Sequence, residues 1–185
     1  MSSAVYAMKV PDQRSTTATF ADLALPLFDQ LYNFAHWLTQ DAAEAEDLVQ
    51  ETHVKALRGF SGFQAGTNFR AWIFRILRNA FLNSRAGLKM VALDPDDEEP
   101  ASDAPSPEAV LVAQANRETV RAALTELAVP QREILLLCEV EEMSYEEIAQ
   151  VLSIPIGTVM SRLYRARKAL RAVLLGNFQG GSHGL

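Results

Sequence analysis

Apolar residues recur at helical spacing through most of the chain, and strict alternation of apolar and polar residues persists nowhere. Spacings of three and four residues are typical of amphipathic helices, whereas alternation is typical of half-buried strands. The sequence therefore predicts an all-α fold. Residues 89–106 interrupt the pattern, because they are acidic and rich in Pro, Ala and Ser. This composition is typical of a flexible segment, so we expect two small helical domains joined by an acidic flexible linker.

The predicted boundaries follow these changes in composition. We expect a loose tail, a first domain, the linker, a second domain and a disordered tail at residues 1–18, 19–88, 89–106, 107–175 and 176–185. No apolar run is long enough to cross a bilayer, and the N-terminus lacks the pattern of a signal peptide. Cys138 is the single cysteine, which excludes an internal disulfide. We expect a cytoplasmic protein without membrane insertion, in which Cys138 is a buried structural thiol.

The stretch from Ser144 to Leu174 has the pattern of a helix-turn-helix. Ser144 and Glu147 have the spacing of a capping box, and Pro155 breaks the chain before a second helix begins. That second helix has one apolar stripe and an open face of hydroxyl and arginine side chains, which suits reading of the DNA major groove. A helical hairpin with solvated arginines also fits, because helix-turn-helix patterns are short.

A second basic stretch, residues 69–85, mixes arginines and asparagines with aromatic residues. Rings stack on unpaired bases, arginines meet phosphates and amides read base edges. This helix is therefore a candidate for binding single-stranded DNA, although the residues alone slightly favour a core helix with solvated arginines. The acidic patch around Asp47 is, taken alone, typical of a solvated helix face. Glu141 and Glu142 are expected in a surface turn with nothing nearby to shift their pKa values.

Charge and missing motifs exclude several classes of function. The net charge of -6 argues against a protein that coats DNA, but the bases gather in two local stretches. The three histidines have no metal-ligand spacing with one another or with Cys138. No P-loop, nucleotide-binding glycine motif or GxSxG is present. We therefore predict no enzymatic activity, no metal and no cofactor.

Three segments, taken in order, resemble the extracytoplasmic-function (ECF, group IV) sigma factors of the sigma-70 family. They are AEDLVQETHVKAL, FRAWIFRILRNAFLN and MSYEEIAQVLSIPIGTVMSRLYRARKAL, within residues 20–174. The resemblance implies a bacterial sigma factor that binds core RNA polymerase, at the clamp coiled coil of the largest subunit and the flap. It implies promoter-specific initiation at -35 and -10 elements, and an anti-sigma factor that holds the chain inactive. The segment GTVMSRL resembles redox-responsive members paired with zinc-binding anti-sigma factors.

The resemblance also implies three sets of site residues. Those for polymerase binding are Asp47, Gln50, Glu51 and His53. Those for the -10 element are Asn68, Arg75, Arg78, Asn79 and Asn83. Those for the -35 element are Thr158, Ser161, Arg162, Tyr164, Arg165 and Arg167. Two positions depart from the family pattern: Met160 stands where many relatives carry Arg, and Ser153 replaces the common turn glycine.

Two other functions stay open on the residues alone. A stand-alone helix-turn-helix regulator would bind an operator as a dimer, and its free chain would bind duplex DNA tightly. An all-helical interaction protein would use its basic face for an acidic partner, and it would show no dependence on promoter sequence.

Overall fold

The computed structural model describes residues 19–64, 66–85 and 117–180, and every regular element within them is helical. The first domain contains α1 (Phe20–Ala24), α2 (Phe28–Thr39), α3 (Ala42–Gly59) and α4 (Phe69–Ser84). The second contains α6 (Arg117–Glu126), α7 (Val129–Leu135), α8 (Tyr145–Leu152) and α9 (Ile156–Gly180). Short 3-10 segments η1 (Leu25–Leu27) and η2 (Phe60–Gly62), and the π-helical turn η3 (Leu136–Val140), join them. The all-α prediction is confirmed, whereas the predicted linker lies outside the described residues.

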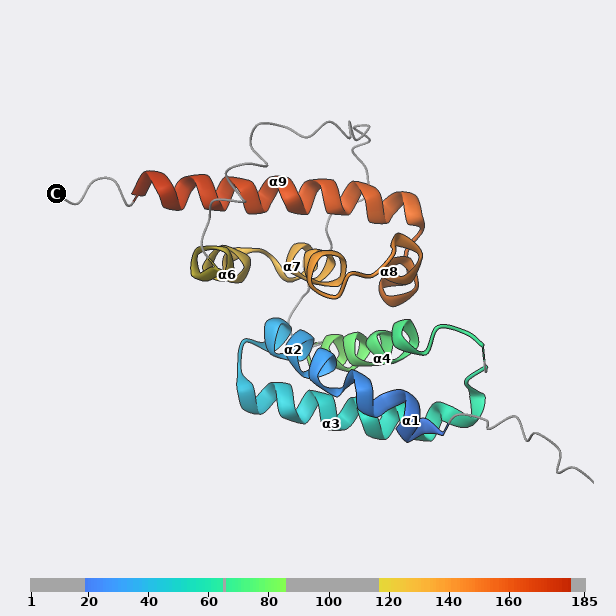
Figure 1. Ribbon diagram of the computed structural model, residues 1–185. Helices are drawn as coiled ribbons and strands as arrows, with labels where there is room; N and C mark the ends of the chain where they lie inside the picture. The colour runs from blue at the N-terminus through green and yellow to red at the C-terminus, as the bar shows by residue number, and fades with distance from the viewer. Residues whose placement is uncertain (1–18, 65, 86–116, 181–185) are drawn as a thin grey trace, which may run out of the picture.

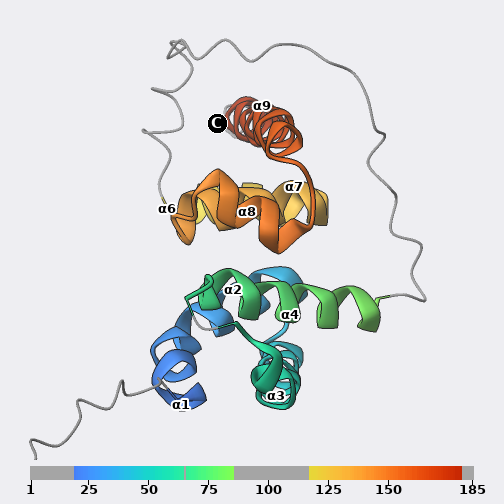
Figure 2. The ribbon, with the colours of Figure 1, turned by 90° about the vertical axis from the view of Figure 1, so that its right-hand side faces the viewer.

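The helices form layers, with the second domain stacked on the first (Figures 1 and 2). Helix α9 is outermost and covers the layer formed by α6, α7 and α8. That layer rests on α2 and α4, and α3 closes the far side of the first domain together with α1. The two domains meet where α7 and α8 face α2 and α4.

Side-chain caps set the starts of three helices. Asp41 Oδ1 accepts a hydrogen bond from the Glu44 N–H at 2.8 Å at the start of α3. At α8, Ser144 and Glu147 form the predicted capping box, with bonds of 3.2 and 2.7 Å. Asn68 Oδ1 accepts from the Ala71 N–H at 3.0 Å and caps α4. Each cap satisfies a backbone donor that has no partner within its helix.

Each domain buries apolar side chains where its helices meet. Phe34 of α2 and Phe74 of α4 pack with ring centroids 5.3 Å apart, and both are almost fully buried. In the second domain Ile134, Ile148 and Leu163 are buried from three different helices. Burial of one such side chain stabilises the fold by about 1.5–3 kcal/mol. The apolar stripes that predicted these helices therefore form the cores.

Helix α9 runs to Gly180, five residues beyond the end that the sequence predicts for the second domain. Leu174 is buried, so the packing that holds the helix extends to its predicted end. Gly176 follows, and a single glycine costs a helix only about 1 kcal/mol relative to alanine. The glycine therefore does not stop the helix where the prediction placed the start of a disordered tail.

Candidate nucleic-acid and polymerase interfaces

Arginine and asparagine side chains of the first domain hold acidic residues of the second. Arg78 Nε donates to Glu133 Oε1 at 2.5 Å, and both side chains are largely buried. Arg70 Nη2 donates to the Glu141 carbonyl at 2.6 Å and to its carboxylate at 3.0 Å. These residues join α4 to α7 and to the segment that follows η3, which makes the boundary between the domains strongly polar.

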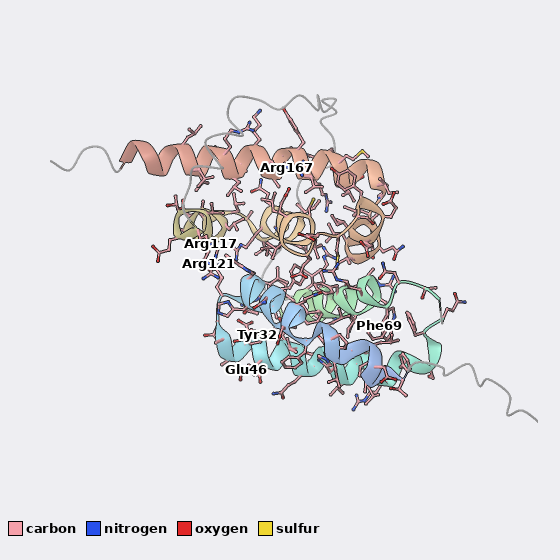
Figure 3. All side chains as sticks on the ribbon, viewed as in Figure 1. Tyr32, Glu46, Phe69, Arg117, Arg121 and Arg167 are labelled. Atoms are coloured by element: carbon pink, nitrogen blue, oxygen red, sulfur yellow. The ribbon has the colours of Figure 1, made fainter. Side chains whose placement is uncertain are left out.

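Three further contacts extend this boundary along α4 and α2. Asn68 Nδ2 donates to Glu147 Oε1 at 2.6 Å, from the start of α4 to the start of α8. Arg132 Nη1 donates to the Trp37 carbonyl at 2.9 Å. The Arg121 guanidinium lies 5.8 Å from the centroid of the Trp37 ring, and Figure 3 shows Arg121 on α6 at this boundary. The contacts therefore span the length of the two facing layers.

Burial raises the pKa of both Glu133 and Glu141, although the facing arginines oppose this shift. Arg78 and Arg162 act on Glu133, and Arg70 acts on Glu141. The prediction that Glu141 lies in a surface turn with an unshifted pKa is therefore wrong. Its side chain is only 5% exposed because Arg70 of the other domain covers it. The next residue, Glu142, is exposed as predicted.

The residues expected at the -10 element divide into two groups. Arg75, Asn79 and Asn83 are exposed and lie four residues apart along one line of α4. Asn68 and Arg78 face the second domain and bind its glutamates. A cleft of about 410 Å³ lies between the start of α4 and α8, and its lining includes Asn68 and Arg75. The structure therefore does not bring all five residues to one open surface.

A cluster of aromatic rings supports the start of α4. Phe69 packs edge-on against Phe63 at 5.3 Å between centroids and lies 5.4 Å from Trp72. Phe20 and Phe60 complete the cluster around Phe69. Figure 3 labels Phe69 on α4. Phe69 is buried and Trp72 is half-buried. Both rings thus act mainly as core, as expected, and one part of Trp72 reaches the cleft.

The residues expected to bind polymerase lie on α3, but only three of them are on its open face. Asp47, Gln50 and Glu51 are exposed. His53 is half-buried: its Nδ1 donates to the Val49 carbonyl at 2.8 Å, and its ring lies 5.6 Å from that of Phe28. His53 is therefore less open to a partner than the other three residues.

Two apolar residues on the same face of α3 were not predicted from the sequence. Val54 is 47% exposed and Leu57 is 60% exposed. Both follow Glu51 at helical spacing, so the open face is acidic at one end and apolar at the other. The signal in the sequence was that both positions fall outside the buried stripe of Val49, Thr52 and Ala56.

The residues expected at the -35 element all lie on α9, with different degrees of exposure. Tyr164, Arg165 and Arg167 are exposed. Thr158, Ser161 and Arg162 are half-buried. Arg165 Nε donates to the Ser161 carbonyl at 3.4 Å. Figures 1 and 2 show that α9 lies on the side of the second domain away from the first.

Arg167 already has partners within its own domain. Its Nη2 donates to Glu139 Oε1 at 2.7 Å and lies 3.8 Å from Cys138 Sγ; Figure 3 labels it on α9. Cys138 is half-buried rather than buried, and burial raises the pKa of its thiol. A thiol with a raised pKa carries little of the reactive thiolate, which agrees with a structural residue.

Neither a membrane-spanning helix nor a metal-binding cluster is found among the described residues. None of these helices is both long and apolar enough to span a membrane. Within residues 19–64, 66–85 and 117–180, no group of three or more His, Cys, Asp or Glu is arranged to hold a metal ion.

Comparison with known proteins decides the family. Residues 26–89 match the family described as Sigma-70 region 2, and residues 117–170 match Sigma-70, region 4. The chain is 37% identical to the ECF RNA polymerase sigma factor EcfG of Rhodopseudomonas palustris, over 85% of this chain and 86% of that protein. The chain belongs to the ECF sigma factors.

Only part of a second relative matches this sigma factor. It is the ECF RNA polymerase sigma factor SigE of Mycolicibacterium smegmatis, 37% identical over 85% of this chain. The chain spans 65% of that protein's length.

ECF sigma factors direct promoter-specific transcription as regulatory initiation factors and are not enzymes.

Two solved structures share the fold. One is the sigma factor RpoE in complex with the anti-sigma factor NepR from Bartonella quintana, with a TM-score of 0.61, 30% identity and coverage of 83% of this chain and 97% of that one. The other is CnrH in complex with the cytosolic domain of CnrY, with a TM-score of 0.62, 25% identity and coverage of 85% and 88%.

Proposed function

We propose that this sigma factor reads the duplex -35 element with the open face of α9. The main observation that supports this proposal is that the open face of α9 has exposed basic residues on the outside of the molecule. No acidic residue follows Glu147 in the chain, so nothing on α9 repels phosphates. Arg165 and Tyr164 are the exposed candidates for base contacts. Thr158, Ser161 and Arg162 lie at the edge of the same helix.

The melted -10 strand is the proposed ligand of α4. Arg75, Asn79 and Asn83 form an open line of one cation and two amides, which suits phosphates and the edges of unpaired bases. Asn68 and Arg78 reach the strand only after the glutamates of the second domain release them. We therefore propose that the two domains separate when the sigma factor joins core polymerase.

The exposed face of α3 is the proposed contact with the clamp coiled coil. Asp47, Gln50 and Glu51 supply charge and amide groups, while Val54 and Leu57 supply apolar area. Interfaces of this kind combine an apolar centre with a polar rim. The flap is the expected contact of the second domain, and the cytoplasm is the expected location because the polymerase acts there.

An anti-sigma factor is the proposed regulator. The solved neighbour RpoE was determined in complex with the anti-sigma factor NepR, which supports such a partner for this chain. The segment GTVMSRL supports the narrower proposal of a redox-responsive sigma factor whose partner binds zinc. Co-purification of a partner from cells, followed by measurement of its zinc content and of its release by thiol oxidants, tests this proposal. A partner without zinc would contradict it.

Run-off transcription with purified bacterial core polymerase tests the main proposal. We expect transcripts only when the sigma factor is present, and only from promoters with matching -35 and -10 elements. Tight duplex binding by the free chain without any stimulation would favour the operator-binding regulator instead. Absence of both activities would favour the interaction protein.

Arg165→Ala tests the role of α9. We expect the variant to lose about 1–3 kcal/mol of discrimination at one or two base pairs of the -35 element, because an arginine that reads a base is removed. Promoter variants at each -35 position measure this loss. Arg117→Ala is the matched control, since Arg117 is an exposed arginine of the same domain that belongs to α6 and not to the open face of α9. Unchanged selectivity in Arg165→Ala would contradict the assignment.

A further inference from the structure

Three large apolar side chains line one edge of the open face of α9. Ile156, Met160 and Tyr164 lie one turn apart and are 40%, 48% and 40% exposed. They are separate from the buried stripe of this helix, which contains Val159 and Leu163. Single exposed apolar residues are common, but a continuous stripe of them marks a contact surface. Because α9 lies outermost in the molecule, neither domain covers the stripe in this structure.

Charge on the same helix indicates what covers the stripe. Arg165, Arg167 and Lys168 are exposed beside it, and α9 carries no acidic residue. A cationic surface of this kind complements a polyanion such as duplex DNA. A partner that contacts the stripe must therefore present apolar groups between rows of negative charge.

The DNA major groove has one apolar group of this kind, the C5 methyl of thymine. The thioether of Met160 is at best a weak hydrogen-bond acceptor, so it cannot read the polar edge of a base as arginine does. Its unbranched, flexible side chain adapts well to a methyl group. Met160 lies in the second turn of α9, near the helix N-terminus that recognition helices direct at base edges.

We propose that Met160 is a specificity residue that reads the C5 methyl group of a thymine in the -35 element. Ile156 and Tyr164 extend the apolar edge on either side and exclude water from the contact. The inference rests on the proposed placement of α9 in the -35 duplex. It assigns to Met160 a contact that does not depend on charge, and thus a preference for thymine over cytosine.

Deoxyuridine substitution in synthetic promoter duplexes tests the proposal with the complete holoenzyme. The -35 sequence is first selected from a randomised region, and each thymine of either strand is then replaced singly by deoxyuridine. This replacement removes only the methyl group. At one thymine we expect promoter binding by the unaltered sigma factor to weaken roughly fourfold, because burial of one such group contributes about 0.8 kcal/mol. In Met160→Ala, the thymine and deoxyuridine duplexes should bind equally.

Three controls isolate the contact between Met160 and the methyl group. Deoxyuridine outside the -35 element should have no effect on promoter binding. Thermal unfolding of Met160→Ala should match that of the unaltered chain, because the side chain is half exposed. Met160→Gln keeps the length of the side chain and should also lose the preference for thymine.

Two results would overturn the proposal. One is equal binding of the deoxyuridine and thymine duplexes, within error, at every -35 position. The other is a thymine preference that persists in Met160→Ala; if Tyr164→Ala removes that preference, the methyl contact belongs to Tyr164 instead. A holoenzyme that ignores the -35 sequence altogether would instead refute the proposed function of α9, and this inference with it.

Discussion

Ser153 forms the turn of the helix-turn-helix in a backbone conformation that serine rarely adopts. Its φ is 56° and its ψ is 46°, in the left-handed region, and its N–H donates to the Ala149 carbonyl at the end of α8. This conformation costs residues other than glycine about 1–2 kcal/mol. The next helix begins almost at once, so the angle between α8 and α9 depends on this one residue.

Replacement of Ser153 by glycine should therefore stabilise the protein. We expect Ser153→Gly to raise the free energy of unfolding by about 0.5–1 kcal/mol, since relief of left-handed strain outweighs the larger entropy loss of glycine. Urea denaturation followed by circular dichroism measures the change. Ser153→Ala keeps the strain and removes only the exposed hydroxyl, so it should leave stability nearly unchanged. A lower stability in Ser153→Gly would show that the turn is not strained.

Helix caps could be predicted from the sequence, whereas ion pairs between residues far apart in the chain could not. Ser144 was predicted as a helix cap because its partner Glu147 lies three residues away in sequence. Glu133 and Glu141 were not recognised as buried, because their partners Arg78 and Arg70 are 55 and 71 residues distant. No pattern within one segment reveals such a pair. The family motifs indicated candidate helices for function, but not which of their side chains stay free.

At the scale of elements, α7 and the π-helical turn η3 connect the two domains. Glu133 lies in α7, and Glu141 follows η3 directly. The Glu141 N–H donates to the Leu136 carbonyl at 2.9 Å, five residues back, in the wider turn of a π-helix. The periodicity of the apolar run in this region does not indicate the π-helical turn.

Glu133→Ala should open the boundary between the domains. Removal of one partner leaves Arg78 buried without a countercharge, which costs about 3–5 kcal/mol for a buried ion pair. We expect a lower energy-transfer efficiency between dyes on Glu46→Cys and Ala172→Cys, in a Cys138→Ser background. These sites lie on the outer helices α3 and α9. Binding of single-stranded -10 DNA by the free chain should rise.

The same element offers a matched control for that variant. Glu139 pairs with Arg167, and both side chains are about half exposed. An exposed pair contributes about 0–1 kcal/mol, and this one lies within a single domain, so Glu139→Ala should leave the energy transfer unchanged. The double variant Glu133→Leu with Arg78→Met should close the domains again. Equal behaviour of Glu133→Ala and the unaltered chain would show that this ion pair does not hold the domains together.

At the scale of the whole molecule, stacking of the domains leaves the proposed surfaces on α3 and α9 open. It covers part of the proposed -10 surface on α4. The faces of α3 and α9 point outward on opposite sides (Figures 1 and 3). Of the residues proposed for the -10 element, Asn68 and Arg78 bind the second domain and Arg75, Asn79 and Asn83 remain exposed. Polymerase can therefore reach α3 before the domains separate, and full access to the -10 strand follows separation.

Acidity should favour the stacked arrangement. The pKa values of Glu133 and Glu141 are raised above the ordinary value of 4.5, mainly by burial. Separation of the domains exposes both groups and returns their pKa values toward 4.5, so the stacked form binds protons more tightly. Its stability relative to the open form should rise as the pH falls from neutral toward 4.5, and above the raised pKa values the contribution of these groups should be constant.

Energy transfer between the same two dye positions, recorded from about pH 8 to about pH 5, measures this dependence. Glu147 has the opposite shift: although burial opposes it, hydrogen bonds from Ser144 and Asn68 lower its pKa, so its effect falls below pH 4.5 and outside the range. The double variant Glu133→Gln with Glu141→Gln cannot titrate at these positions and should show a flatter curve. Opening of the unaltered chain on acidification across this range would mean that the facing arginines outweigh burial, so that the pKa values of Glu133 and Glu141 are lowered rather than raised.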